Sequence, residues 1–329
     1  MKAQVVKQFG PASSFETAQV ETPVLGPNEV LIEVQATSVN PIDTKVRSGK
    51  AAIFAPAFPM ILHGDVAGVV KEVGRGVTRF KIGDRVYGCA GGVKGTGGAL
   101  GEFMAADAAS LALAPQNISL REAATVPLVA LTAWEGLIDK AGLRPGDRVL
   151  IVGGVGGVGQ LAIQLARAAG AIVDTTASSE EKRTLAQDLG AHAVVNYKQE
   201  ALADFAARRT NGKGYDIVFD TVGATSLQNS FGLAKLNGKV IFIGTAESHD
   251  LRPAYVRGVS LIGVLMLIPL LTGEGRERHG EILRRMTELI EAGAIRPLVD
   301  PTRFGFDQVG AAHERLESGA AVGKIAISR

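Results

Sequence analysis

The chain has 329 residues, a length that suggests about two domains, each large enough to bury its own core. The formal charges nearly cancel at +2, which argues against nucleic acid or an anionic membrane as a partner. A single cysteine, Cys89, excludes an internal disulfide and a multi-thiolate zinc site, and we expect it to be a small buried residue. The N-terminus lacks a signal-peptide core, and no apolar run reaches the roughly 20 residues of a membrane span, so we expect a soluble, cytoplasmic protein.

Residues 1–123 have the alternation of short β-strands separated by turn residues. A short helical turn starts at Asn40, and a helix is predicted over 119–141, with Ser119 as its N-cap and Glu122 completing a capping box. Together these features predict a compact β-barrel or sandwich with functional loops, followed by a helix. The strand patterns cover 1–9, 29–38, 66–73, 85–88 and 102–106.

From 148 to about 266, strand and helix patterns alternate, as in a doubly wound parallel sheet. A helix is predicted over 278–292 and β segments at 303–306 and 324–328, a pattern that resembles residues 1–123 more than the alternating region. The strands of the alternating region are expected at 149–152, 171–177, 193–197, 216–222, 239–244 and 260–267, and its helices at 160–169, 179–189, 200–209 and 224–234.

The stretch from Arg148 to Gly159 has the clearest functional pattern. An apolar run leads into Gly153-Gly154-Val155-Gly156-Gly157-Val158-Gly159, and a helical pattern follows. Gly154, Gly156 and Gly159 match G-x-G-x-x-G in its strand–turn–helix context. A helix N-terminus offers unpaired N–H groups and a partial positive charge, so we predict that residues 154–159 bind the pyrophosphate of a dinucleotide. The alternative is a tight turn without a ligand.

Besides the glycine turn, the chain contains five further motifs: Asn40-Pro41-Ile42-Asp43 with Arg47-Ser48-Gly49, Gly64-Asp65-Val66-Ala67-Gly68-Val69-Val70, Lys81-Ile82-Gly83-Asp84-Arg85-Val86, Leu131-Thr132-Ala133-Trp134 and Gly323-Lys324. With these motifs the chain resembles the zinc-free medium-chain dehydrogenases/reductases of the quinone oxidoreductase (zeta-crystallin-like) type. The resemblance covers essentially the whole chain and implies an α/β fold. Residues 1–123 and 267–329 would form a GroES-like β-barrel catalytic domain, residues 124–266 a Rossmann domain with a doubly wound parallel sheet, and the active site would lie in the cleft between them.

The resemblance also argues against a metal. Asn40 stands where zinc-dependent relatives have a cysteine ligand, and Gly64 where they have a histidine. His63 is one position away, and a shift of one residue on a strand turns a side chain to the opposite face. Without a Lewis acid to polarise an alcohol, we expect hydride delivery to an acceptor that is already activated.

The dinucleotide is predicted to be NADPH rather than NADH. In the resemblance, Ser178 takes the place of the carboxylate that contacts the ribose in NAD enzymes, and Ser179 and Lys182 suit a 2′-phosphate. Tyr197 matches a family tyrosine that meets the same phosphate. Asp174 also lies about 20 residues after the turn, which would favour NADH, but its mid-strand position is too early to reach the ribose. The serines also suit an ordinary helix start, and Tyr197 a half-buried strand position.

Further site residues follow from strand ends and from the family match. Gly244 and Thr245 end a strand and are assigned to the nicotinamide side, and Lys324 is assigned to cofactor binding. Asn40 could hydrogen-bond a substrate carbonyl or the nicotinamide amide, or simply cap the turn before Pro41. We expect the other catalytic-side residues to act as follows: Asp43 braces the loop, Lys45 orients the acceptor or is merely solvated, and Thr132 lies near the nicotinamide or bonds a helix carbonyl.

We therefore expect an NADPH-dependent, zinc-independent reductase of quinones or related activated carbonyls. One alternative is an enoyl-thioester or alkenal double-bond reductase of the same superfamily. Another is a non-catalytic NADPH-binding protein, crystallin-like or RNA-binding, although the near-zero net charge argues against RNA. The apolar strand 260–267 predicts a homodimer, because such an edge would otherwise favour aggregation. The remaining histidines, His192, His249, His279 and His313, have no metal-binding spacing and are expected to be surface or structural residues.

Overall fold

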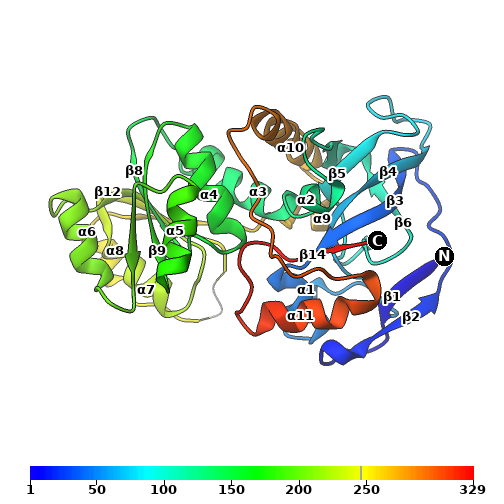
Figure 1. Cartoon of the computed structure of the whole chain (residues 1–329), viewed down its shortest axis with the longest axis horizontal. Helices are drawn as coiled ribbons and strands as arrows, with labels where there is room; N and C mark the ends of the chain where they lie inside the picture. The colour runs from blue at the N-terminus through cyan, green and yellow to red at the C-terminus, as the bar shows by residue number, and fades with distance from the viewer. Residues whose placement is uncertain (245–246) are drawn as a thin grey trace. The chain divides into compact units, whose positions relative to one another are not determined.

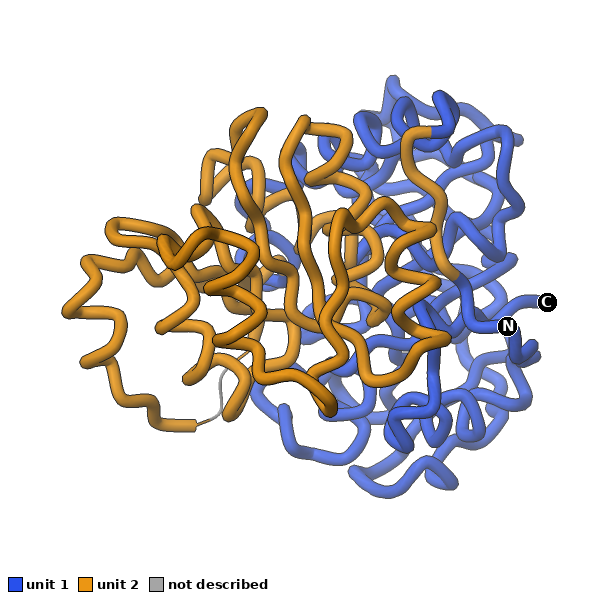
Figure 2. The backbone as a smooth tube through the Cα atoms, turned by 60° about the vertical axis from the view of Figure 1, so that its left-hand side comes forward, with its two compact units in different colours: residues 1–128, 267–293, 299–329 blue, residues 129–266, 294–298 orange. Residues whose placement is uncertain are grey.

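The computed structural model describes residues 1–244 and 247–329. The chain forms two compact units (Figure 2): residues 1–128, 267–293 and 299–329 make the first, and residues 129–266 and 294–298 the second. The domain boundaries expected from the sequence differ from these units at residues 124–128 and 294–298. The roles assigned to the two domains stay a prediction.

The second unit contains a six-stranded parallel sheet in the order β10-β9-β8-β11-β12-β13. The chain starts in the middle at β8, moves outward through β9 and β10, and returns to the other side of β8 at β11, which is the doubly wound order. The expected α/β fold class is therefore confirmed. The strands are β8 (Arg148–Val152), β9 (Ile172–Ala177), β10 (Ala193–Asn196), β11 (Tyr215–Asp220), β12 (Ala234–Phe242) and β13 (Ser260–Gly263).

Helices connect these strands (Figure 1). The side chains of β8 from Val149 to Val152 are buried, as expected for a central strand with both faces covered. The helices are α4 (Gly157–Ala168), α5 (Glu180–Asp188), α6 (Leu202–Thr210), α7 (Thr225–Ser230) and α8 (Arg252–Tyr255). No helix of the described residues is long and apolar enough to cross a membrane.

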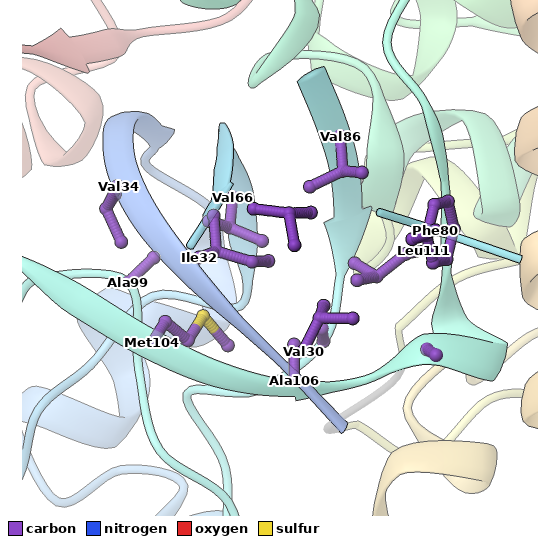
Figure 3. Close-up of a cluster of buried hydrophobic side chains, with 13 residues drawn as sticks. Val30, Ile32, Val34, Val66, Phe80, Val86, Ala99, Met104, Ala106 and Leu111 are labelled. Atoms are coloured by element: carbon purple, nitrogen blue, oxygen red, sulfur yellow. The ribbon is translucent and has the colours of Figure 1, made fainter. Parts of the chain in front are cut away.

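The first unit is built on an antiparallel sheet in the order β14-β3-β4-β5-β7, with β6 also paired to β3, so the β-rich character predicted for this part of the chain is confirmed. Alternate side chains of these strands, such as Val30, Ile32 and Val86, meet in one buried apolar cluster (Figure 3). The strands are β3 (Glu29–Ser38), β4 (Asp65–Val73), β5 (Arg85–Cys89), β6 (Phe103–Asp107), β7 (Leu111–Leu113) and β14 (Ala326–Ser328), beside a separate pair, β1 (Lys2–Val6) and β2 (Phe15–Gln19).

The helices of the first unit include α1 and α11, which lie side by side (Figure 1). Helix α1 starts at the Asn40-Pro41 step, as the sequence predicts. The helices are α1 (Pro41–Arg47), α2 (Leu120–Ala123), α9 (Ile268–Thr272), α10 (Arg276–Glu291) and α11 (Val309–Glu317).

The predicted continuous helix over 119–141 is wrong. The capping box is present, with Glu122 N donating to Ser119 Oγ at 3.2 Å and Ser119 N donating to Glu122 Oε2 at 2.9 Å. However, α2 ends at Ala123 and α3 (Pro127–Trp134) begins anew, followed by a π-helical turn over 135–140. Pro127 causes the break, because proline lacks an N–H and disfavours helical backbone in the residue before it.

Two predicted β segments are shorter than expected. β13 stops at Gly263, rather than reaching Leu267, because its partner β12 ends at Phe242, the residue paired with Gly263. Residues 303–306 form no strand: Phe304 makes a single bridge to Ile327, since β14 itself has only three residues.

Candidate functional site

The glycine turn joins β8 to α4, and at three of its positions the backbone or the close packing disfavours any residue larger than glycine. Gly153 has φ +89°, a left-handed backbone that favours glycine. A Cβ on Gly154 would lie 2.2 Å from Thr175 Oγ1, and a Cβ on Gly159 would lie 2.1 Å from the Gly153 carbonyl oxygen. The G-x-G-x-x-G match includes Gly154 and Gly159 but overlooks Gly153, whose conformation no spacing reveals.

The N-terminus of α4 is suited to a phosphate. Gly156 is the N-cap and has no side chain to occupy the first N–H groups of this 12-residue helix. The first turn carries no acidic residue, so the partial positive charge of the helix end is not neutralised locally. These residues fit the pyrophosphate of a dinucleotide, as the sequence pattern predicts.

The segment after β9 holds the residues assigned to the 2′-phosphate. Ser178 and Lys182 are half-buried, and Ser179 Oγ caps α5 by accepting from Lys182 N at 3.3 Å. The cap confirms the structural reading of Ser179 and leaves its role toward a phosphate as a prediction. Tyr197 follows β10 with 54% of its surface exposed, so it is not a half-buried strand residue.

Asp174, the carboxylate that would favour NADH, is committed elsewhere. It is fully buried within β9, accepts two hydrogen bonds from Arg209 at 3.0 and 2.9 Å, and accepts a third from Tyr215 Oη at 2.9 Å. Three of its roughly four acceptor sites are used, and burial keeps the remaining one away from solvent. Asp174 therefore serves as a buried ion-pair centre and does not offer its carboxylate to a ribose.

The other predicted residues fall in different surroundings. Gly244 is exposed just after β12, Lys45 is exposed on α1, and Thr132 is buried on α3. Thr245 lies outside the described residues.

A buried polar cluster in the first unit brings Asn40 and Lys324 together with Asp65, which the sequence analysis did not assign to the site. Lys324 Nζ donates to Asn40 Oδ1 at 2.5 Å and lies 3.6 Å from Asp65 Oδ2. Asn40 Nδ2 donates to the same Asp65 oxygen at 2.8 Å. None of the three side chains is more than 3% exposed. The position of Lys324 makes it a partner of Asn40, and its predicted contact with a cofactor stays a prediction.

Asp43 lies next to this cluster and braces the start of α1. Its carboxylate accepts from Asn40 N at 2.8 Å, which holds the Asn40 backbone at the helix start. Burial raises the pKa of Asp43 to about 7, although the Asn40 N–H opposes that shift. Burial also lowers the pKa of Lys324 and raises the pKa of the Cys89 thiol, which is fully buried as expected. Cys89 is therefore not an activated nucleophile.

The donor set around Asn40 does not fit a catalytic zinc. A zinc site needs thiolate, imidazole or carboxylate ligands, and here an amide and an ammonium lie among the carboxylates of Asp65 and Asp43. The Lys324 ammonium would repel a metal cation at this place. Across residues 1–244 and 247–329, no group of three His, Cys, Asp or Glu side chains is arranged to hold a metal ion.

The expectation that His63 lies on a strand is wrong. β4 begins only at Asp65, and His63 has φ +71°, a backbone conformation that is uncommon outside glycine. Its fully buried ring pairs with His313 of α11, Nε2 to Nε2 at 2.9 Å. This pair, and not the strand alternation, decides where the His63 ring points.

The protons of this histidine pair follow from their neighbours. Arg47 Nη1 lies 3.2 Å from His313 Nδ1, and a guanidinium only donates, so His313 Nδ1 accepts. His313 Nε2 must then carry the proton and donate to His63 Nε2. His63 Nδ1 in turn donates to Thr37 Oγ1 at 3.2 Å, and the Thr37 hydroxyl donates to Asp65 O at 2.6 Å. Both rings are neutral, and the row of hydrogen bonds ends on the backbone of Asp65.

We expect the protein to lose stability as the pH falls below 6.5. Burial lowers the pKa of His313 from 6.5 to about 3 and that of His63 well below 6.5, so each binds its proton only after unfolding. Asp43 has the opposite effect on the pH dependence of stability. Its pKa is about 7 in the folded state against its ordinary value of 3.8, so between these pH values it releases its proton on unfolding. Two histidines outweigh one aspartate, so unfolding takes up about one net proton. The free energy of unfolding should therefore fall by about 2 kcal/mol between pH 6.5 and pH 5.

Urea unfolding at several pH values measures this slope. His313→Gln should lower the net proton uptake on unfolding by about one proton. An unchanged slope in His313→Gln would contradict the assignment.

Comparison with known proteins adds to this geometry. Residues 26–116 match the model of the alcohol dehydrogenase GroES-like domain, and residues 189–327 match the zinc-binding dehydrogenase model. The chain is 34% identical to the 2-methylene-furan-3-one reductase of Solanum lycopersicum, covering 99% of this chain and 79% of that protein. It is 33% identical to the quinone oxidoreductase of Rattus norvegicus, covering 99% and 97% of the two chains.

Solved structures are similar over the whole chain. An alcohol dehydrogenase superfamily protein from Novosphingobium aromaticivorans superimposes with a TM-score of 0.95 at 38% identity, covering 100% of this chain and 99% of that one. The Escherichia coli quinone oxidoreductase complexed with NADPH superimposes with a TM-score of 0.88 at 26% identity, covering both chains completely.

Proposed function

Because the chain belongs to the medium-chain dehydrogenase/reductase superfamily and is quinone oxidoreductase-like within it, we propose that it is an NADPH-dependent, zinc-independent reductase of quinones or related activated carbonyls. The observation that carries the proposal is the contact between Lys324 Nζ and Asn40 Oδ1. An ammonium at this place disfavours a metal cation, and an acceptor reduced without a metal must already be activated.

The bound cofactor would supply the hydride. In the proposal, residues 154–159 and the N-terminus of α4 hold its pyrophosphate, and Ser178, Ser179 and Lys182 surround the 2′-phosphate. Tyr197 would contact the same phosphate. Gly244 would line the nicotinamide side, where ligands meet the carboxyl ends of parallel strands.

Fewer residues are assigned to binding the electron acceptor than to binding the cofactor. We assign Asn40 to the acceptor carbonyl, Lys45 to orienting the acceptor from its exposed position on α1, and Thr132 to the nicotinamide region. Asp43 acts as the brace of α1 rather than as a proton donor. Water can protonate the reduced product, so the chain contributes chiefly positioning and exclusion of water.

Oxidation of NADPH in metal-free buffer tests the proposal, with quinones, alkenals and enones as acceptors. Turnover with at least one quinone or enone is expected, and adding zinc should not raise it. No turnover with any acceptor, or activity that requires a divalent metal, would contradict it. Tight NADPH binding without consumption would instead indicate a non-catalytic dinucleotide-binding protein.

A second candidate is the reduction of a carbon–carbon double bond conjugated to a carbonyl. It is favoured by the 34% identity to an enzyme named for reducing a 2-methylene-furan-3-one. Both reactions deliver hydride to an activated acceptor, so they share the site residues. A higher kcat/KM for alkenals or methylene ketones than for quinones would select this candidate.

We also propose a homodimer formed through β13. Among the described strands β13 pairs only with β12, so its other edge is open. Leu261 and Leu265, within the predicted stretch 260–267, are 36% and 42% exposed. An apolar open edge favours pairing with a second copy. Light scattering should give twice the monomer mass, and a proline at Leu261 should reduce it to the monomer mass.

A further inference from the structure

The side-chain amide of Asn40 has one orientation that satisfies its neighbours. Lys324 Nζ can only donate, and it lies 2.5 Å from Asn40 Oδ1. The Asp65 carboxylate can only accept, and its Oδ2 lies 2.8 Å from Asn40 Nδ2. Turning the amide over would bring donor against donor and acceptor against acceptor. The charge pair therefore fixes the direction of the amide.

Both charged residues are held by contacts that do not involve Asn40. Lys324 Nζ also donates to Val39 O at 2.8 Å. Asp65 accepts from Ser38 Oγ at 2.6 Å and from Leu128 N at 2.8 Å. The lysine and the carboxylate thus form a frame that exists before any ligand arrives.

The frame gives the two sides of the amide different surroundings. Oδ1 faces the Lys324 ammonium, whereas Nδ2 faces the Asp65 carboxylate and lies within hydrogen-bond range of the Asp43 carboxyl. A ligand that approaches from the Nδ2 side therefore meets the donor end of the amide, and it would take over the contact with Asp43.

We propose that Lys324 and Asp65 are positioning residues that hold Asn40 as an oriented hydrogen-bond donor to the carbonyl oxygen of the acceptor. This rests on the proposed function, because negative charge gathers on that oxygen as hydride arrives at the conjugated carbon. A preformed donor stabilises such a charge without reorganisation at the moment of reaction. The acceptor class is therefore one with a carbonyl oxygen conjugated to the carbon that takes the hydride.

The double variant Asp65→Asn/Lys324→Met tests the role. Either single variant leaves a buried charge without its counter-charge and should lower the thermal midpoint. The double variant removes both charges, so its midpoint should recover relative to the single variants, while its amide is no longer forced into one direction. We expect kcat with a quinone or enone to stay about 100-fold below wild type. A Kd for NADPH that rises by the same factor as kcat falls would overturn the proposal in favour of a direct contact between Lys324 and the cofactor.

A control removes a second, partly buried charge pair of the same unit, Asp107 with Arg276, in which Arg276 Nη1 lies 2.9 Å from Asp107 Oδ2. Asp107→Asn/Arg276→Met should leave kcat at the wild-type value. Recovery of kcat together with the midpoint in Asp65→Asn/Lys324→Met would overturn the proposal.

A second readout does not depend on turnover. In protein labelled with ¹⁵N-asparagine, the Nδ2 hydrogens of Asn40, assigned by loss of the signal in Asn40→Asp, should be separated more widely than those of an exposed asparagine, because one of them donates to the Asp65 carboxylate. In the double variant these should move toward each other. Unchanged resonances would also overturn the proposal. If the wild-type protein shows no turnover at all, the proposed function fails, while these resonances still decide the orientation.

Discussion

Replacing Gly159 with alanine should raise the Kd for NADPH by about 100-fold, which corresponds to about 2.8 kcal/mol. The added Cβ would lie 2.1 Å from the Gly153 carbonyl oxygen and 3.0 Å from Gly154 Cα. Backbone atoms cannot rotate away as a side chain can, so the whole turn must shift. The shift would displace the first N–H groups of α4 from the pyrophosphate that we assign to them. Titration of NADPH fluorescence measures the effect.

Gly232→Ala is the matched control in the same unit. A Cβ there would meet only Asn229 O at 3.8 Å, an ordinary contact, and its backbone is not left-handed. It should bind NADPH like the wild type. If Gly159→Ala bound NADPH normally, the turn would not be the phosphate site. If it also unfolded at a much lower urea concentration, binding should be compared at a temperature where both variants are folded.

The parallel sheet could be predicted from the sequence because its signals are local. The apolar run 149–152, the glycines after it and the alternation up to residue 266 each depend on neighbours in the chain, and all the predicted strands of that region exist. The predictions were wrong at the ends of elements, whose positions depend on pairing with a distant segment or on a single helix-breaking residue. β13 ends where β12 ends, and Pro127 divides a helix whose pattern is otherwise continuous.

The buried polar cluster could be predicted only in part. The family match identified Asn40 and Lys324, but their contact joins residues 284 positions apart and no spacing reveals it. The same holds for Asp174, whose partners Arg209 and Tyr215 lie 35 and 41 positions away. The His63–His313 pair spans 250 positions, and the strand assumption for His63 failed because His63 adopts a left-handed backbone that alternation cannot predict.

The preference for NADPH should invert when Ser178 becomes aspartate. Ser178 follows β9 directly and is half-buried, with Lys182 on the first turn of the next helix. A carboxylate at this place would repel the 2′-phosphate, and it could accept a hydrogen bond from the free 2′-hydroxyl of NADH. We expect the Kd for NADPH to rise about 100-fold and the Kd for NADH to fall, so that their ratio reverses.

Ser178→Asn separates charge from shape, because asparagine matches aspartate in size without its charge. It should weaken NADPH binding far less than Ser178→Asp, and only the aspartate variant should bind NADPH more tightly as salt is added, since salt screens the repulsion. Lys182→Met should weaken NADPH binding and leave NADH binding unchanged, because only the phosphate needs a cation. If all three variants kept the wild-type ratio, the 2′-phosphate would be bound elsewhere. Asp174 would still not be the ribose ligand, since its oxygens are already bound to Arg209 and Tyr215.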